Sequence, residues 1–389
     1  MNLIPTSALI ARWYNALSRL EYGTLHFVSP AGERATFKGL NPGPEAEFAI
    51  SSWDVIRRMV ARGDIAMGED YIEGLWTTPA IEPLFSLFLL NLDALDGFAN
   101  GNIIHKSLLA MHNQLVRRNS KRGSSRNIRA HYDVGNAFYS LWLDKTMTYS
   151  SALDTSATTP LEQAQTNKYQ RILGRIEQQN ASVLEIGSGW GGFAEQAAGS
   201  NHQITGLTVS PAQHEFSRKR LGSTADIRLQ DYRDVRGTFD TIVSIEMFEA
   251  VGERYWPVYF NQLRERMNRG GKAIIQTITI RDDLFNAYRT RSDFVRHYVF
   301  PGGMLPSFKR FREEAEKAGL KVTDSHFFGH DYAHTLQVWG ERLIAKRSEI
   351  LALGYDEKFI RNWEYYLGMC AAAFSIGRTD VAQVELKHA

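Results

Sequence analysis

The sequence VLEIGSGWGGFAEQ at residues 183–196 is an apolar run that breaks into glycines and then resumes with residues compatible with a helix. Gly187, Gly189 and Gly192 satisfy the pattern G-x-G-x-x-G. Glycines at this spacing allow a tight strand–turn–helix to approach a nucleotide closely. The stretch therefore predicts a Rossmann-like nucleotide site and leaves open which nucleotide the turn holds.

The flanking sequence alternates apolar, strand-like segments with amphipathic ones. The strand-like segments are residues 181–189, 202–210, 225–232, 239–248 and 270–280, and helical patterns such as 211–222 and 255–271 separate them. This alternation predicts an α/β fold with a doubly wound, mostly parallel sheet. In such a sheet the ligand is expected outside the carboxyl ends of the strands.

The residues around the turn favour S-adenosylmethionine (SAM) over a dinucleotide. A dinucleotide site usually has an acid about 20 residues after the glycines, but residues 204–213 contain no acidic residue and no arginine. SAM carries no phosphate, so Glu185 can order its amino-acid end while the glycines let the backbone come close. Neutral partners for the ribose and a face for the adenine are available at Thr208, Ser210, Gln213 and Tyr232. The alternative is that these are ordinary strand-end glycines and turn hydroxyls.

The first 105 residues are predicted to form a small separate α+β domain. Short strand-like segments at 23–30, 34–40 and 46–52 precede a helical segment at 52–63 and an apolar helix at 84–92. Residues 106–126 are predicted to be a basic linker, since no acid occurs between Asp96 and Asp133. The linker is either solvated or a patch for anionic lipid headgroups. The basic residues of this region are Lys106, Arg117, Arg118, Lys121, Arg122, Arg126 and Arg129.

Composition excludes several classes of function. The net charge of +2 gives no global basic field for nucleic acid. A single cysteine, Cys370, excludes a disulfide framework and cysteine metal clusters, and no metal site is predicted. Cys370 is expected to be a packing residue. Neither a convincing signal peptide nor an apolar stretch long enough to span a bilayer is seen, so a cytoplasmic protein with peripheral membrane contact is expected.

Longer motifs carry a family resemblance over residues 127–389. The sequence resembles the cyclopropane-fatty-acid synthases and their mycolic-acid relatives, which implies a class I SAM-dependent methyltransferase domain. The pattern GEDYIEGLW at 68–76 resembles the N-terminal domain of the phospholipid-acting branch, so the resemblance implies phospholipid acyl chains as substrate and a homodimer. The motifs are HYDVGNAFYSLWLDKTMTYSSAL, VLEIGSGWGGFAEQ, GLTVSPAQ, LQDYRD, SIEMFEAVG, FPGGMLPS, DYAHTL and YLGMCAAAFSIGRTDVAQ.

The resemblance also implies site residues. A buried bicarbonate would serve as the base, held by Ser151, Glu249, Gln276, the backbone of Ile278 and Tyr332. Ser151 stands where the family commonly has cysteine, and Gln276 where histidine is common. A hydroxyl and an amide can both still donate to an anion. The implied SAM contacts are Tyr149, Ser150, Glu185, Gly187, Ser188, Gly189, Trp190, Gly191, Thr208, Gln213, Tyr232 and Arg233.

The implied chemistry is methyl transfer to an unactivated double bond, which leaves a carbocation that must be kept from water. Phe294, Tyr298 and Phe300 are candidates for the wall of an apolar tunnel, or else for the core. Loss of a proton from the new methyl closes a cyclopropane, whereas loss from a neighbouring chain carbon gives a branched product. The alternatives are thus a same-fold enzyme making methyl- or methylene-branched chains and, from another class, a non-catalytic lipid-binding protein.

Overall fold

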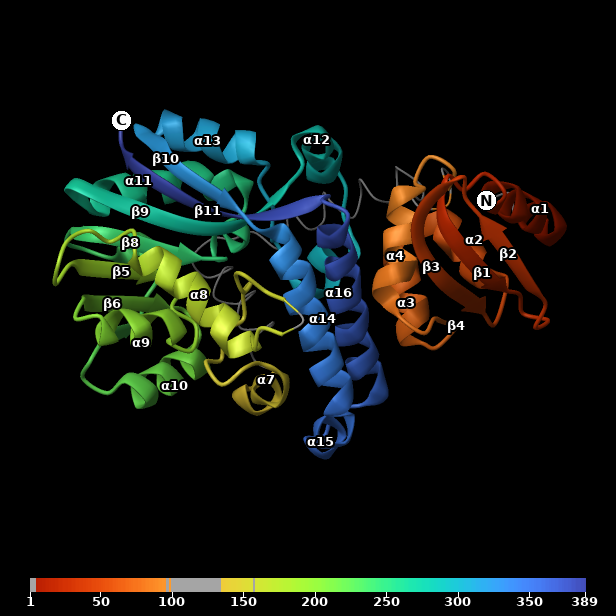
Figure 1. The fold of residues 1–389 in the computed structure, drawn as a ribbon, viewed down its shortest axis with the longest axis horizontal. Coiled ribbons are helices and arrows are strands. Elements are labelled where there is room, and N and C mark those ends of the chain that lie inside the picture. Colours follow the sequence, from red (N-terminus) through yellow and green to blue (C-terminus); the bar gives the residue numbers. More distant parts are fainter. Residues whose placement is uncertain (1–4, 96–97, 99–133, 157) are drawn as a thin grey trace.

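The computed structural model describes residues 5–95, 98, 134–156 and 158–389 and contains two sheets (Figure 1). A four-stranded sheet lies in the N-terminal unit and a seven-stranded sheet in the remainder of the chain. The predicted basic linker at 106–126 lies outside the described residues. Within the described ranges, no helix combines the length and the apolar character needed to cross a membrane.

The N-terminal sheet has the order β2-β1-β3-β4, with β1 parallel to β3 and antiparallel to β2. Alternate residues of β1 point inward, so Phe27 meets Trp13 of α1 with ring centroids 5.8 Å apart. The expected strands and helices of this unit are present. Their bounds are α1 Thr6–Leu17, β1 Tyr22–Val28, β2 Arg34–Lys38, β3 Asn41–Ile50, α2 Asp54–Arg62, α3 Asp64–Ile72, β4 Trp76–Thr77 and α4 Ile81–Leu90.

The large sheet has the order β10-β11-β9-β8-β5-β6-β7. The five predicted strands pair in parallel, while β11 runs antiparallel to both β9 and β10. The predicted α/β Rossmann-like fold is confirmed, with an antiparallel pair added at one edge. The strands are β5 Ser182–Ile186, β6 Gln203–Thr208, β7 Asp226–Leu229, β8 Phe239–Ile245, β9 Met267–Ile280, β10 Leu320–Phe327 and β11 Thr379–His388.

Helices cover both faces of this sheet and bury its apolar strands. One core cluster packs α11 and α13 against it, and another packs α8 and α9. The helices and turns are α7 Asn136–Trp142, α8 Leu161–Leu173, α9 Gly192–Gly199, α10 Pro211–Leu221, η1 Tyr232–Asp234, η2 Phe248–Ala250, η3 Glu253–Tyr255, α11 Trp256–Arg266, α12 Asp282–Thr290, η4 Val295–Val299, α13 Phe308–Lys317, α14 Gly329–Ala345, α15 Arg347–Ala352 and α16 Glu357–Ser375.

The paired helices α14 and α16 lie between the large sheet and the N-terminal unit (Figure 1). Tyr365 of α16 packs against Phe85 of α4 and Phe294, with ring centroids 5.2 and 4.7 Å apart. Arg361 lies over the ring of Tyr71, and its Nε donates to the Tyr71 carbonyl at 2.6 Å. One hydrophobic core therefore continues from the N-terminal unit into α14 and α16.

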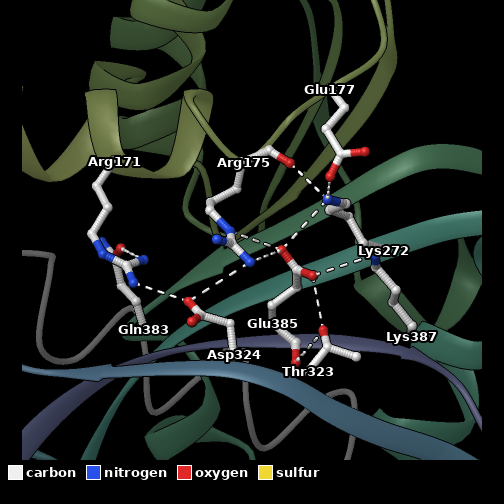
Figure 2. Close-up of polar contacts among 9 residues, drawn as sticks. All are labelled: Arg171, Arg175, Glu177, Lys272, Thr323, Asp324, Gln383, Glu385 and Lys387. Carbon is white, nitrogen blue, oxygen red and sulfur yellow. Dashed lines mark hydrogen bonds and ion pairs between the residues drawn. The ribbon is translucent and has the colours of Figure 1, made fainter.

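A polar network fixes the C-terminal end of α8 to the antiparallel edge of the sheet (Figure 2). Arg171 pairs with Asp324 of β10 at 3.0 Å, and Arg175 pairs with Glu385 of β11 at 3.0 Å. Lys272 of β9 lies 3.4 Å from the Glu385 carboxylate. The Glu385 side chain is almost fully buried, so these cations compensate a charge that would otherwise be costly to bury.

We expect Gly68→Ala to destabilise the protein at the contact between the two units. A Cβ at Gly68 would lie 2.3 Å from the ring carbons of Phe294, so the rigid ring must move. Overpacking of this kind costs about 1–3 kcal/mol of unfolding free energy. Urea unfolding followed by circular dichroism measures this loss.

Gly340→Ala in α14 is the matched control, because a Cβ there meets nothing within 4 Å. It should leave stability unchanged or raise it by up to about 1 kcal/mol, as alanine favours helices. Equal stability of the two variants would contradict the packing described for Gly68.

Candidate active site

The glycine turn joins β5 to α9 at the carboxyl edge of the sheet. The N–H groups of Gly187 and Ser188 both donate to the carbonyl of Leu207 in β6, at 2.9 and 2.8 Å. Gly187 has a φ of 86°, and a Cβ there would approach the Met247 side chain to 3.0 Å. The turn is therefore held open toward a cavity by backbone contacts to the next strand.

This cavity has a volume of about 600 Å³, which lies within the range of small-molecule sites. Its polar end lies over the tips of β5, β6 and β7, where a Rossmann-like sheet is expected to bind its ligand. Eleven of the twelve residues predicted to contact SAM line it. They are Tyr149, Ser150, Glu185, Gly187, Ser188, Gly189, Trp190, Thr208, Gln213, Tyr232 and Arg233.

Glu185 has the properties expected of a group that receives the amino-acid end of SAM. Its side chain is buried, and among the described residues its Oε2 has no hydrogen-bond partner. Burial raises the pKa of Glu185 to about 8, against the opposing charge of Lys168. An ammonium group would satisfy this carboxylate, so the residues present fit SAM.

Two predicted contact residues have structural roles instead. Gly191 does not line the cavity; it precedes α9 with a φ of 85°, and a Cβ there would lie 3.0 Å from Leu221. The Ser210 hydroxyl accepts a hydrogen bond from the Gln213 N–H at 3.3 Å and thereby caps α10. Arg233 lines the cavity but is held by Asp231, with contacts of 2.8 and 2.6 Å.

The other end of the cavity is apolar and is built from both parts of the chain. Phe300 lines it as predicted, but Phe294 is fully buried at the contact with α3, and the exposed Tyr298 donates to Glu69 at 2.6 Å. Cys370 also faces the cavity, and burial raises its pKa to about 12. The apolar lining includes Met59, Met67, Phe85, Phe88, Leu89, Leu92, Leu95, Met369 and Phe374.

Glu249 also lines the cavity and lies in η2, four residues after the end of β8. Its Oε1 accepts hydrogen bonds from the Thr277 hydroxyl at 2.9 Å and from the N–H of Ile278 in β9. Among the described residues, its Oε2 has no hydrogen-bond partner. Burial and the negative charge of Glu246 raise the pKa of Glu249 to about 8.

Glu246 is a second carboxylate at the same strand end, and the sequence analysis did not select it. Its Oε1 accepts from the Ser151 N–H at 2.8 Å and from Gln276 Nε2 at 2.7 Å, and the Tyr332 hydroxyl also hydrogen-bonds to it. Glu246 has a φ of 49°, a left-handed conformation that costs a residue with a side chain about 1–2 kcal/mol. The signal that could have found it is an acid three residues before Glu249 and directly after a buried strand.

The groups expected to hold bicarbonate thus lie together, but their hydrogen bonds go to the protein's own carboxylates. The Ser151 N–H, Gln276 and Tyr332 contact Glu246, while the Ile278 N–H contacts Glu249. The Ser151 hydroxyl donates to the Ala152 carbonyl at 2.8 Å. Ser151 and Gln276 do not line the cavity. The residues present therefore do not fit a bicarbonate at this position.

A buried lysine neighbours these carboxylates and was also not selected from the sequence. Lys168 of α8 is fully buried, and its Nζ donates to the Ser150 hydroxyl at 2.6 Å. Burial lowers the pKa of Lys168 to about 7, against the opposing charges of Glu246, Asp144 and Glu185. The site thus combines several acids with one buried amine.

The fold and the cavity define a SAM-dependent methyltransferase. A solved mycolic acid cyclopropane synthase, in complex with S-adenosylhomocysteine, matches 67% of this chain and 97% of its own with a TM-score of 0.63 and 28% identity. Coclaurine N-methyltransferase shares the fold, with a TM-score of 0.62, at 18% identity over 82% of this chain and 98% of its own.

The family described as mycolic acid cyclopropane synthetase matches residues 119–384, and the chain belongs to it. Tuberculostearic acid methyltransferase of Mycobacterium tuberculosis is 35% identical, covering 85% of this chain and 80% of its own. Cyclopropane-fatty-acyl-phospholipid synthase of Escherichia coli is 33% identical, over 89% of this chain and 88% of its own. These relatives support SAM-dependent modification of lipids.

We expect the stability of the SAM-free protein to depend on pH through Glu185. Its folded-state pKa of about 8 lies above the unfolded value of about 4.3, so folding favours the protonated form. The contribution of Glu185 to the free energy of unfolding is therefore fully present below the unfolded pKa and is lost as the pH rises toward the folded-state pKa of about 8. Between pH 5 and pH 8, wild type should lose roughly 1–4 kcal/mol more than Glu185→Gln, measured by urea unfolding.

The exposed Glu341 of α14 provides the control. Glu341→Gln should follow wild type at both pH values. A wild-type minus Glu185→Gln difference that stays constant between pH 5 and pH 8 would show that the Glu185 carboxyl is not desolvated.

Proposed function

We propose that this chain transfers the methyl group of SAM to the double bond of an unsaturated phospholipid acyl chain and closes a cyclopropane ring. The observation that carries the proposal is one continuous cavity. Polar residues of the glycine turn, apolar residues of α3 and α4, and the acids Glu246 and Glu249 all line it. A charged cofactor and a hydrocarbon chain can therefore meet beside an acid.

When bound, SAM supplies a methyl group on a positively charged sulfur. Glu185 would receive the amino group of the cofactor, and Thr208 and Gln213, which pair at 2.9 Å, would meet the ribose. Tyr232 would face the adenine. Such positioning of two reactants can remove several kcal/mol from a barrier, about 7 kcal/mol or more when alignment is good.

The apolar wall would hold the acyl chain and exclude water from the reacting carbons. Side chains such as Phe85, Phe88 and Phe300 present no heteroatom that could trap a carbocation. The N-terminal unit supplies much of this wall. That placement favours an acyl chain entering from the side of α3 and α4, with the headgroup left outside.

The phospholipid is favoured because the N-terminal unit is retained in the match to the Escherichia coli synthase, which covers 89% of this chain. We further propose a cytoplasmic enzyme, acting as a homodimer, that meets anionic membranes peripherally through its basic residues near 106–126. No nucleic acid is involved in this scheme. No proton is routed through bicarbonate, because the groups that would hold it already bind Glu246 and Glu249.

A second candidate product is a methyl- or methylene-branched acyl chain. The similarity to tuberculostearic acid methyltransferase, at 35% identity over 85% of this chain, favours it. The two candidates share the methyl transfer and differ in which proton is removed afterwards. They are therefore distinguished by the product alone.

We expect purified protein, given SAM and vesicles of a monounsaturated phosphatidylglycerol, to add one carbon to the acyl chain. Gas chromatography–mass spectrometry of the released fatty acids should show a ring with no remaining double bond. A branched alkene would establish the second candidate instead. An unchanged acyl chain, with SAM bound in calorimetry, would overturn both.

Glu249→Gln should lower kcat by about 100-fold or more while SAM affinity stays within a few-fold of wild type. Glu249 lines the cavity, and in its ionised form the carboxylate can stabilise positive charge on the acyl chain. Loss of one such electrostatic group costs about 100–1,000-fold in kcat. Turnover measures the first effect and calorimetry the second, with Glu341→Gln as the control. Undiminished turnover would remove Glu249 from the reaction.

A further inference from the structure

The hydrogen-bond donors near the carboxyl end of β8 converge on one side chain. Glu246 forms hydrogen bonds with the Ser151 N–H, the Gln276 amide and the Tyr332 hydroxyl, which come from three separate parts of the chain. Glu246 also lines the cavity, as does Glu249. An N–H group can only donate, so both contacts to Oε1 favour the ionised form of the carboxyl group, as do the Tyr332 hydroxyl and the charge of Lys168. The protein thus supplies a carboxyl group surrounded by groups that stabilise its negative charge.

The orientation of the Gln276 amide is fixed by a chain of contacts that begins in the network of Figure 2. Arg171 can only donate, so the Gln383 oxygen must face it, at 3.1 Å. The Gln383 amide nitrogen therefore faces Gln276 Oε1, at 3.0 Å. This leaves the Gln276 nitrogen to face Glu246. The donor is held toward the carboxylate by residues on α8, β9 and β11.

Two further features of Glu246 indicate a role beyond packing. It holds a left-handed φ of 49°, and backbone strain of this kind concentrates at functional sites. Its charge lies near the buried Lys168, which opposes the effect of burial on the Glu246 pKa. Burial nevertheless raises that pKa, which makes the carboxylate a better proton acceptor.

We propose that the Glu246 carboxylate is the general base of the reaction and occupies the place of the bicarbonate expected from the family resemblance. This assignment rests on the proposed function and deepens it, because it names the group that removes the proton. The enzyme would then need no bound anion. Tyr332, Gln276 and the Ser151 N–H act as positioning groups for the base.

The step balances without a further reactant. The π electrons of the alkene form a bond to the methyl carbon, the carbon–sulfur bond breaks, and its electron pair remains on sulfur. The acyl chain then carries the positive charge. Glu246 takes a proton from the transferred methyl, and the released C–H electrons close the ring onto the cationic carbon. Removal of a proton from a neighbouring chain carbon would instead give the branched alkene.

The first test measures wild-type turnover in buffer freed of carbon dioxide and bicarbonate. The rate should equal that in buffer with added bicarbonate. Glu246→Gln preserves the shape of the side chain but cannot take the proton, so kcat should fall by about 100-fold or more. SAM affinity in calorimetry should stay within a few-fold of wild type, and Glu341→Gln should keep the wild-type rate.

The second test removes the side chain. Glycine accepts a positive φ without strain, so Glu246→Gly should fold, as circular dichroism can verify. It leaves Gln276, Tyr332 and the Ser151 N–H facing a space that an anion can fill. Added bicarbonate should restore turnover in a saturable manner, and NMR of ¹³C-labelled bicarbonate should show binding to Glu246→Gly and none to wild type.

Each outcome decides the assignment. Wild-type turnover that requires bicarbonate, wild-type turnover by Glu246→Gln, or ¹³C-bicarbonate bound to wild type would overturn it while leaving the proposed function intact. A wild-type protein that binds SAM and makes no lipid product under any condition would overturn the proposed function itself. The NMR measurement needs no turnover, so the two failures are distinguishable.

Discussion

The burial of negative charge beside the end of β8 is the constraint on which the site depends. Glu246 and Glu249 lie three residues apart, and burial raises the pKa of each. Carboxylates in such a position need several donors and a nearby cation to remain ionised. For Glu246 the chain supplies them from β9, α14, α8 and the segment at Ser151. These elements are far apart in the sequence. The charge is therefore compensated only when the large sheet, α8 and α14 have folded together.

The second constraint is that one cavity must serve a charged cofactor and a hydrocarbon. The sheet provides the polar end in the usual place for its fold, whereas the apolar end needs α3 and α4 of the N-terminal unit. The shared core through α14 and α16 holds the two parts together. The N-terminal unit is therefore a wall of the cavity. Close packing at Gly68 against Phe294 belongs to the same contact.

The sequence predicted the features that depend on local pattern. The glycine spacing predicted the turn, and the alternation of apolar and amphipathic segments predicted the five parallel strands. The family resemblance indicated most residues that line the polar end of the cavity, and the structure places them together. The antiparallel strands β10 and β11 were not predicted, since only their pairing with β9 shows where they belong. Phe294 and Tyr298 were candidates for the cavity wall, but the wall is defined by contact with another unit. Glu246 was not predicted as a site residue. Its hydrogen-bond partners come from segments on either side of it in the sequence, and only the folded structure brings them together.

The most direct test of the central claim is a high-resolution crystal structure of the wild type grown with S-adenosylhomocysteine and bicarbonate. The account predicts that the Glu246 carboxylate accepts hydrogen bonds from Gln276 and Tyr332, with the cofactor sulfur facing the two acids from the glycine turn. A separate planar anion between Gln276 and Tyr332, with the Glu246 side chain turned away, would contradict it.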